Sequence, residues 1–201
     1  MDVKPFKISI PDEELSLLQQ KLKLARIPPT YTDWRDDNNI DSAFIRKTVD
    51  YWLNEYDWRA EEAKINEIPQ FTTQIDVSDG FGTLDIHFAH SKSSNPDAVP
   101  LIFIHGWPGS FLEVTKGLKR LNEQFHVVAP SLPGYGFSGY SRKEGFNLWK
   151  VAEVLQKLML RLGYDRFFVQ GGDWGSHISR IIGLTYPENV LAVHTNMVSL
   201  E

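Results

Sequence analysis

Cysteine is absent from the 201 residues, which excludes disulfides, thiolate metal sites and cysteine nucleophiles. A basic excess is missing too: the formal net charge is −5 and no block of like charges occurs, so the sequence lacks the electrostatic footprint of a nucleic-acid-binding protein. The opening residues, MDVKPFKISIPDEE, contain no long apolar run of the kind found in a signal peptide or membrane anchor. These absences predict a cytoplasmic protein with no membrane anchor and no nucleic-acid partner.

Residues 1–70 have the pattern of a helical segment. Leucines recur at helical spacing after Pro11, which suits a first helical turn, and the stretch IPPT ends that pattern. Asp41 and Asp57 are placed to cap two further helices. We therefore predict a helical N-terminal domain over residues 1–70.

Residues 71–201 alternate between strand and helix patterns. The stretches FTTQIDV and TLDIHFAH predict a hairpin. Apolar strands are then expected at VPLIFIHG, HVVAP, RFFVQG and VLAVHTNMV, with helices over residues 111–122, 147–162 and 176–186. Such alternation predicts an α/β domain whose mostly parallel sheet carries helices on both faces, with the functional site where strands end and loops begin.

The loop GGDWGS joins a predicted strand to a predicted helix and places an aspartate among glycines. A strand that turns abruptly into a helix strains the residue at the tip and directs its side chain outward. Gly171, Gly175 and Ser176 are small enough to let the helix pack closely. Asp173 is therefore predicted to occupy the tip of a nucleophile elbow, where most such elbows carry serine. The simpler alternative is a turn residue or helix cap.

A carboxylate is ionised at neutral pH, so it can attack carbon directly and form an ester. This chemistry suits an alkyl carbon that bears a leaving oxygen or halide better than it suits an ester or peptide carbonyl. The loop HGWPGS follows the apolar strand VPLIFI and is predicted to complement the elbow. The main-chain N–H groups of Trp107 and Trp174 are the expected oxyanion-hole donors for hydrolysis of the ester, although both indoles also suit a core or a pocket wall.

With these motifs in place, the sequence resembles the microsomal-type branch of the epoxide hydrolases within the α/β-hydrolase family. The stretches LIFIHGWPGSFLE, VVAPSLPGYGFSG and QGGDWGS match that pattern in order and spacing, and the helical first 70 residues resemble the N-terminal segment of the branch. The resemblance implies an α/β-hydrolase fold, incomplete at its C-terminus, over residues 71–201. It also implies a reaction without cofactor or metal, in which Asp173 opens a small-molecule epoxide to an ester and water releases a vicinal diol.

By the same resemblance, a lid with two tyrosines and then an acid and a histidine should follow VLAVHTNMV, whereas the chain ends at Glu201. We therefore expect a truncated chain in which Asp173 is alkylated and the ester persists. None of the six histidines is predicted to fill the missing role. His177 lies one helical turn after Asp173, and His105 is expected to make a supporting hydrogen bond in the oxyanion loop.

Several alternatives remain open. A haloalkane dehalogenase also uses an elbow aspartate, and a non-catalytic fragment that modulates a full-length subunit would need none of the missing residues. The resemblance further suggests detoxification of epoxides and leaves a homodimer open for the full-length form.

The loop SLPGYGFSG lacks the lysine of a phosphate-binding loop and is predicted to be structural. Glu153 and the acids of the third helix are expected to be solvated.

Overall fold

The computed structural model describes residues 2–27 and 42–197. The chain divides into two compact units, one of residues 8–67 and the other of residues 1–7 together with 68–201. No helix within the described ranges combines the length and the apolarity needed to cross a bilayer.

The smaller unit is helical, as predicted. Its helices are α1 (Asp12–Lys23), α2 (Ser42–Asn54) and α3 (Trp58–Ile65). Asp57 caps α3 by accepting a hydrogen bond from the Ala60 N–H at 3.1 Å, which confirms the predicted cap. Pro11 precedes α1 as its cap residue rather than standing in the first turn. The prolines of IPPT, which are predicted to end the first helix, and the cap predicted at Asp41 lie outside the described residues.

Glu62 is buried within this unit, so the prediction that the acids of the third helix are solvated is wrong for this residue. Its carboxylate accepts hydrogen bonds from the Ile10 N–H at 2.7 Å, the Trp58 indole at 3.1 Å and the Arg59 guanidinium at 2.7 Å. The Ile10 N–H contributes most to holding the pKa of Glu62 below its ordinary value, against the effect of burial. These donors replace the water that a charged carboxylate otherwise requires.

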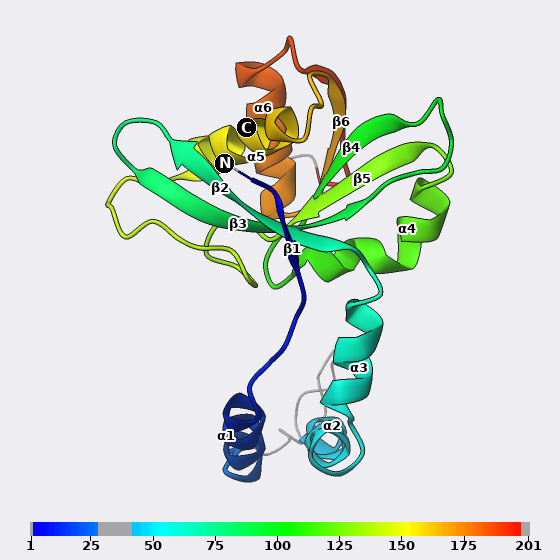
Figure 1. Cartoon of the computed structure of the whole chain (residues 1–201). Coiled ribbons are helices and arrows are strands. Elements are labelled where there is room, and N and C mark those ends of the chain that lie inside the picture. Colours follow the sequence, from blue (N-terminus) through cyan, green and yellow to red (C-terminus); the bar gives the residue numbers. More distant parts are fainter. Residues whose placement is uncertain (1, 28–41, 198–201) are drawn as a thin grey trace, which may run out of the picture. The chain divides into compact units, whose positions relative to one another are not determined.

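The larger unit is built on a seven-stranded sheet with the order β1-β2-β3-β5-β4-β6-β7 (Figure 1). Its strands are β1 (Lys4–Phe6), β2 (Gln70–Val77), β3 (Gly82–Ser91), β4 (Val99–Ile104), β5 (Phe125–Pro130), β6 (Phe167–Gly171) and β7 (Val190–Thr195). The hairpin of β2 and β3 is antiparallel, as predicted, and β1 and β5 continue this antiparallel pairing on its two sides. From β5 onward β4, β6 and β7 pair in parallel.

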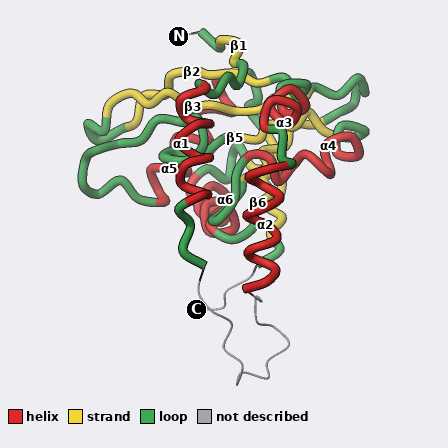
Figure 2. The backbone as a smooth tube through the Cα atoms, turned by 90° about the horizontal axis from the view of Figure 1, so that it is seen from below, coloured by secondary structure: helices red, strands yellow, loops and turns green. Residues whose placement is uncertain are grey.

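Helices connect the parallel strands along the chain, and Figure 2 shows the helices in red and the strands in yellow. They are α4 (Thr115–Leu121), α5 (Leu148–Arg161) and α6 (Trp174–Thr185), with a 3₁₀ turn, η1 (Phe111–Val114), before α4. Figure 1 shows α5 and α6 on one face of the sheet and α4 on the other. The single helix predicted over residues 111–122 is split into η1 and α4. The helix predicted to begin at Ser176 begins two residues earlier, directly after Asp173.

The main core fills the space between the sheet and the helices α5 and α6. Each large apolar side chain that is buried there contributes about 1.5–3 kcal/mol. The fully buried members include Phe88, Ile102, Ile104, Leu155, Leu158, Phe167, Ile178 and Ile182. Because β4 and β6 are neighbours in this sheet, the loops that follow them emerge at the same edge.

Glu153 on α5 is buried rather than solvated, which corrects the sequence prediction. Its carboxylate accepts hydrogen bonds from Ser78 N–H and Oγ–H, both at 2.7 Å, and from Lys150 and Lys157 at 3.0 and 2.7 Å. Burial alone would raise the pKa of Glu153, but the Lys157, Ser78 and Lys150 hydrogen bonds outweigh it and lower that pKa to about 2. The network ties α5 to the turn of the hairpin.

We expect this network to make the stability of the protein depend on acid pH. Because the pKa of Glu153 falls from 4.5 to about 2 on folding, its contribution is fully present above pH 4.5 and is lost as the pH falls toward 2. Glu153→Gln should lower the free energy of unfolding by about 2–3 kcal/mol at pH 7 and by much less near pH 2.

Urea unfolding of both proteins at the two pH values measures this difference. Glu188→Gln, at an exposed glutamate of the same unit, is the matched control and should change little at either pH. A Glu153→Gln effect of the same size at pH 7 and pH 2 would contradict the account.

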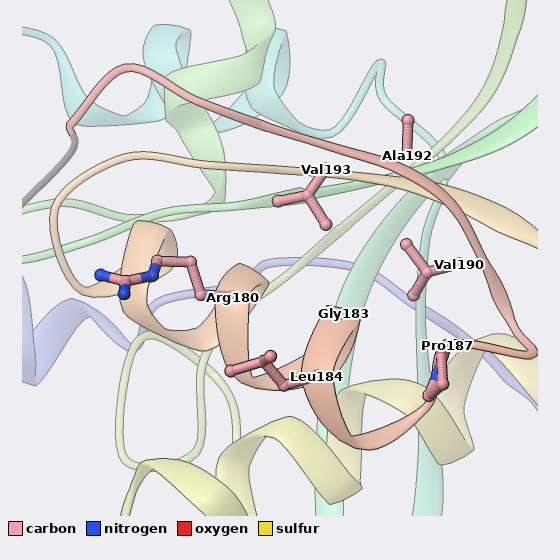
Figure 3. Close-up of a pocket in the computed structure, with 7 residues that line it drawn as sticks. All are labelled: Arg180, Gly183, Leu184, Pro187, Val190, Ala192 and Val193. Atoms are coloured by element: carbon pink, nitrogen blue, oxygen red, sulfur yellow. The ribbon is translucent and has the colours of Figure 1, made fainter.

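An apolar groove of about 430 Å³ lies between α6 and β7 at the edge of the described sheet (Figure 3). Leu184 is 73% exposed beside it and Val193 is 39% exposed. The full lining consists of Arg180, Gly183, Leu184, Pro187, Val190, Ala192 and Val193. These residues belong to the later turns of α6 and to β7 and its approach, not to the loops HGWPGS or GGDWGS.

Candidate active site

Asp173 stands at the point where β6 turns into α6, as the sequence predicts. Its backbone has φ 51° and ψ −125°, a region that side-chain-bearing residues rarely adopt. The Ser176 N–H and hydroxyl both donate to the Asp173 carbonyl, at 2.9 and 2.7 Å, and so close the first turn of the helix beneath it. Asp173 itself is exposed. The result is a sharp turn that presents a carboxylate outward.

Two glycines allow this turn to press against the neighbouring strand. A Cβ at Gly175 would lie 2.2 Å from the main-chain oxygen of Ile104, at the end of β4. A Cβ at Gly171 would lie 2.1 Å from the main-chain oxygen of Gly175. Real Cβ atoms do not approach backbone atoms so closely, so the packing of α6 on the sheet requires glycine at positions 171 and 175.

The loop HGWPGS after β4 reaches the same carboxylate. The Trp107 N–H donates to Asp173 Oδ1 at 2.7 Å. Gly106 lies directly against the aspartate, because a Cβ at position 106 would be 2.4 Å from both Cβ and Oδ1 of Asp173. The register of β4 and β6, in which Ile104 is opposite Gly171, brings the two loops together.

Main-chain N–H groups dominate the electrostatics of Asp173. The Trp107 N–H contributes most and the Trp174 N–H contributes next to holding the pKa of Asp173 below its ordinary value, while slight burial opposes them and His177 supports them. Of the two amides that the sequence singles out, the Trp107 N–H is hydrogen-bonded to this carboxylate, and the Trp174 N–H also lowers its pKa. At neutral pH the group is an anion held by two dipoles.

The surroundings of Asp173 are aromatic and polar. Trp107 and Trp174 are 66% and 45% exposed as residues, so neither is a core residue. His177 lies on α6 with its ring 5.9 Å from that of Trp174, one turn beyond the aspartate as predicted. Sequence reasoning missed Asn196, whose amide lies so close to Gly172 that a Cβ there would be 2.7 Å from Asn196 Oδ1. Its position just after the carboxyl end of β7 was the available signal.

His105 is fully buried and makes the supporting hydrogen bonds that the sequence predicts. Its Nδ1 lies 2.9 Å from the Gly106 carbonyl oxygen, and its Nε2 accepts from the Leu132 N–H at 3.1 Å. Burial lowers the pKa of His105, with the Gly106 carbonyl and then Glu113 opposing that effect. The imidazole is therefore neutral at physiological pH.

The other buried histidines are structural. His87 lies between Ser131 Oγ at 2.9 Å and Gln70 Oε1 at 3.1 Å, and His90 contacts the Tyr164 hydroxyl at 2.9 Å. Burial lowers the pKa of each to about 4, with Lys92 and His126 adding to the effect at His90. Both rings are hydrogen-bonded parts of the sheet.

The loop SLPGYGFSG closes on itself. The Gly134 N–H donates to the Gly139 carbonyl at 3.0 Å, and the Ser138 hydroxyl donates to the Ser131 carbonyl at 2.7 Å. These internal bonds fit the structural role predicted for it.

Across residues 2–27 and 42–197, no three histidine, aspartate or glutamate side chains gather in a way that could hold a metal ion.

Comparison with known proteins places these features in a family. A family model described as the N terminus of epoxide hydrolases matches residues 3–114. A second, described as the alpha/beta hydrolase fold, matches residues 99–200. The overlap of the two covers β4 and the loop HGWPGS.

Individual relatives agree over nearly the whole chain. Epoxide hydrolase 1 of Sus scrofa is 39% identical, with 97% of this chain and 45% of the relative aligned, and juvenile hormone epoxide hydrolase 2 of Ctenocephalides felis is 38% identical over 97% and 43%. The solved structure of Aspergillus niger epoxide hydrolase superposes with a TM-score of 0.87 at 40% identity, covering all of this chain and 54% of that one. The chain thus spans about half the length of these relatives.

Proposed function

Because the chain belongs to the epoxide hydrolase family and has the α/β-hydrolase fold, we propose that it hydrolyses epoxides to vicinal diols with Asp173 as the nucleophile. One observation carries the proposal: an aspartate at positive φ, exposed at the tip of the elbow, has Oδ1 bound 2.7 Å from the Trp107 N–H. A hydrogen-bonded, ionised carboxylate in this position is ready to attack without first losing a proton.

In the first step, one carboxylate oxygen of Asp173 attacks a ring carbon of the epoxide. The carbon–oxygen bond of the ring breaks, and the released alkoxide oxygen takes up a proton, which leaves a hydroxyalkyl ester. The hydrogen bond from Trp107 supports a role for Oδ1 as the oxygen that stays in place and becomes the ester carbonyl, with Oδ2 as the attacking atom. The exposed indoles of Trp107 and Trp174 offer apolar surface for the substituents of the epoxide.

In the second step, water attacks the ester carbonyl carbon and negative charge develops on Oδ1. The N–H groups of Trp107 and Trp174 are the proposed oxyanion hole, and a single donor of this kind is worth about 10²–10³ in kcat. The bond from the carbonyl carbon to Oδ2 then breaks and the diol leaves. The proton donor and the base that activates water are roles that the family resemblance gives to two tyrosines and a histidine–acid pair, and we assign them to none of the residues described here.

Incubation of the protein with a small reactive epoxide such as styrene oxide tests the proposal. Intact-mass measurement should show a gain of one epoxide mass, or product analysis should show the vicinal diol if the ester is turned over. Release of bromide from a bromoalkane, with neither adduct nor diol from epoxides, would favour a haloalkane dehalogenase instead. Inertness toward both substrates would favour the non-catalytic modulator.

Other expectations stay predictions. They are a role in detoxification, a cytoplasmic location, a homodimer of the full-length form and a division into domains of residues 1–70 and 71–201. The name of the Ctenocephalides felis relative associates that protein with juvenile hormone.

A further inference from the structure

The peptide unit between Gly106 and Trp107 is held from both sides. Its N–H, which belongs to Trp107, donates to Asp173 Oδ1 at 2.7 Å. Its C=O, which belongs to Gly106, lies 2.9 Å from His105 Nδ1. Because a peptide unit is planar, fixing the direction of its C=O also fixes the direction of its N–H.

The hydrogen-bond partners of His105 determine its tautomer. Nε2 faces the Leu132 N–H at 3.1 Å, and a main-chain N–H can only donate. Nε2 must therefore carry the lone pair, which places the proton of the neutral ring on Nδ1. Nδ1–H then donates to the Gly106 carbonyl. The ring is the middle link in a chain that runs from Leu132 through His105 and the Gly106–Trp107 peptide to Asp173.

This peptide needs such a constraint because position 106 has to be glycine. A Cβ there would lie 2.4 Å from Asp173 Oδ1, so a larger residue would displace the carboxylate. Glycine, however, has more conformational freedom than any other residue. A rotation of the peptide would turn the Gly106 carbonyl toward the Asp173 carboxylate. The hydrogen bond from the Trp107 N–H would then be replaced by repulsion between two oxygen atoms.

The ring of His105 is well placed to supply the constraint. It is fully buried, and the ring of Tyr135 packs against it edge-on with the centroids 5.4 Å apart. Leu132 and Tyr135 belong to the loop after β5, so the imidazole connects that loop with the one after β4. Hydrogen bonds in such a chain also polarise one another, which strengthens the N–H at the far end.

We propose that His105 is a positioning residue that locks the Gly106–Trp107 peptide, so that the Trp107 N–H faces the Asp173 carboxylate and the oxyanion later formed on it. The oxyanion part rests on the proposed function, whereas the lock on the resting carboxylate does not. His105 exchanges no proton with substrate, because both of its nitrogens are engaged by the main chain.

Two substitutions separate the two bonds of the ring. The Asn amide nitrogen can take the place of Nδ1 and still donate to the Gly106 carbonyl, whereas Gln reaches the place of Nε2 and preserves only the bond with Leu132. In NMR titrations, His105→Asn should keep the lowered pKa of Asp173. His105→Gln should raise that pKa toward its ordinary value of 3.8 and speed hydrogen exchange at the Trp107 amide by about 5-fold or more.

His90→Asn is the control, because this buried histidine contacts Tyr164 rather than the site, and it should leave both readings unchanged. Equal behaviour of the Asn and Gln variants at position 105 would overturn the proposal. The unmodified protein offers a test that needs no variant to fold: imidazole ¹⁵N shifts must show the proton on Nδ1, and a proton on Nε2 refutes the lock. These readings are independent of epoxide chemistry, so an inert protein with the expected shifts would refute the proposed function and leave the role of His105 intact.

Discussion

Asp173→Asn is expected to abolish covalent capture of an epoxide, with the rate of adduct formation falling by roughly 10⁴-fold or more. The amide keeps the size of the carboxylate, and asparagine tolerates a positive φ, so the elbow should survive the change. The neutral amide oxygen is a far weaker nucleophile than the carboxylate oxygen. Intact-mass spectrometry over time, followed by peptide mapping of the adduct, measures both the rate and the site.

Asp165→Asn is the matched control, because Asp165 is an exposed aspartate just before the opposite end of β6. It should form the adduct at the unmodified rate. Adduct formation by Asp173→Asn at a comparable rate, or an adduct mapped to any other side chain, would remove Asp173 from the role of nucleophile.

The route of the oxygen atoms distinguishes an ester mechanism from direct attack of water on the epoxide. In an ester mechanism, water attacks the carbonyl carbon of the ester and leaves its oxygen in the Asp173 carboxylate. When the reaction is run in ¹⁸O-labelled water, the label therefore enters Asp173 first. The diol of the first turnover therefore carries the unlabelled Oδ2. A labelled diol from the first turnover, with no label in the peptide that holds Asp173, would show that the carboxylate only activates water.

The elbow could be predicted from the sequence because its signals are local. An apolar run, glycines at fixed offsets and a following helix together specify the turn, and the structure has Asp173 at φ 51° where those signals converge. The approach of the Trp107 N–H also followed from local order, since strands that are adjacent in a parallel sheet bring their following loops together. The catalytic roles of Asp173, Trp107 and Trp174 stay predictions.

Two of the errors concern side chains that have a partner remote in sequence. Glu153 has the polarity of a solvated helix residue, but its partner Ser78 is 75 residues upstream and belongs to a hairpin turn. Glu62 accepts from the Ile10 N–H across 52 residues. Helical periodicity records the polarity of a side chain and carries no information about such pairing, so it predicted solvent where the fold supplies donors. Asn196 beside Gly172 was missed for a different reason, since it follows a strand and only its place after the end of β7 marks it.

Gly175→Ala is expected to lower the free energy of unfolding by at least about 3 kcal/mol. The new Cβ would lie 2.2 Å from the Ile104 main-chain oxygen and 2.9 Å from that of His105. Neither atom belongs to a flexible side chain, so relief requires α6 to move away from the end of β4. That movement would also separate Asp173 from the Trp107 N–H. Urea unfolding measures the loss of stability.

The same substitution at another helical glycine should have the opposite sign. Gly117 lies in α4, where a Cβ would meet only Leu121 Cδ1 at 3.8 Å. Gly117→Ala should therefore stabilise the protein by up to about 1 kcal/mol through helix propensity alone. If both variants shifted stability in the same direction, close packing of α6 on β4 could not be the reason for glycine at position 175. The difference between the Gly175→Ala and Gly117→Ala variants therefore measures the contact of Gly175 with the end of β4. This contact allows the sharp turn that exposes Asp173.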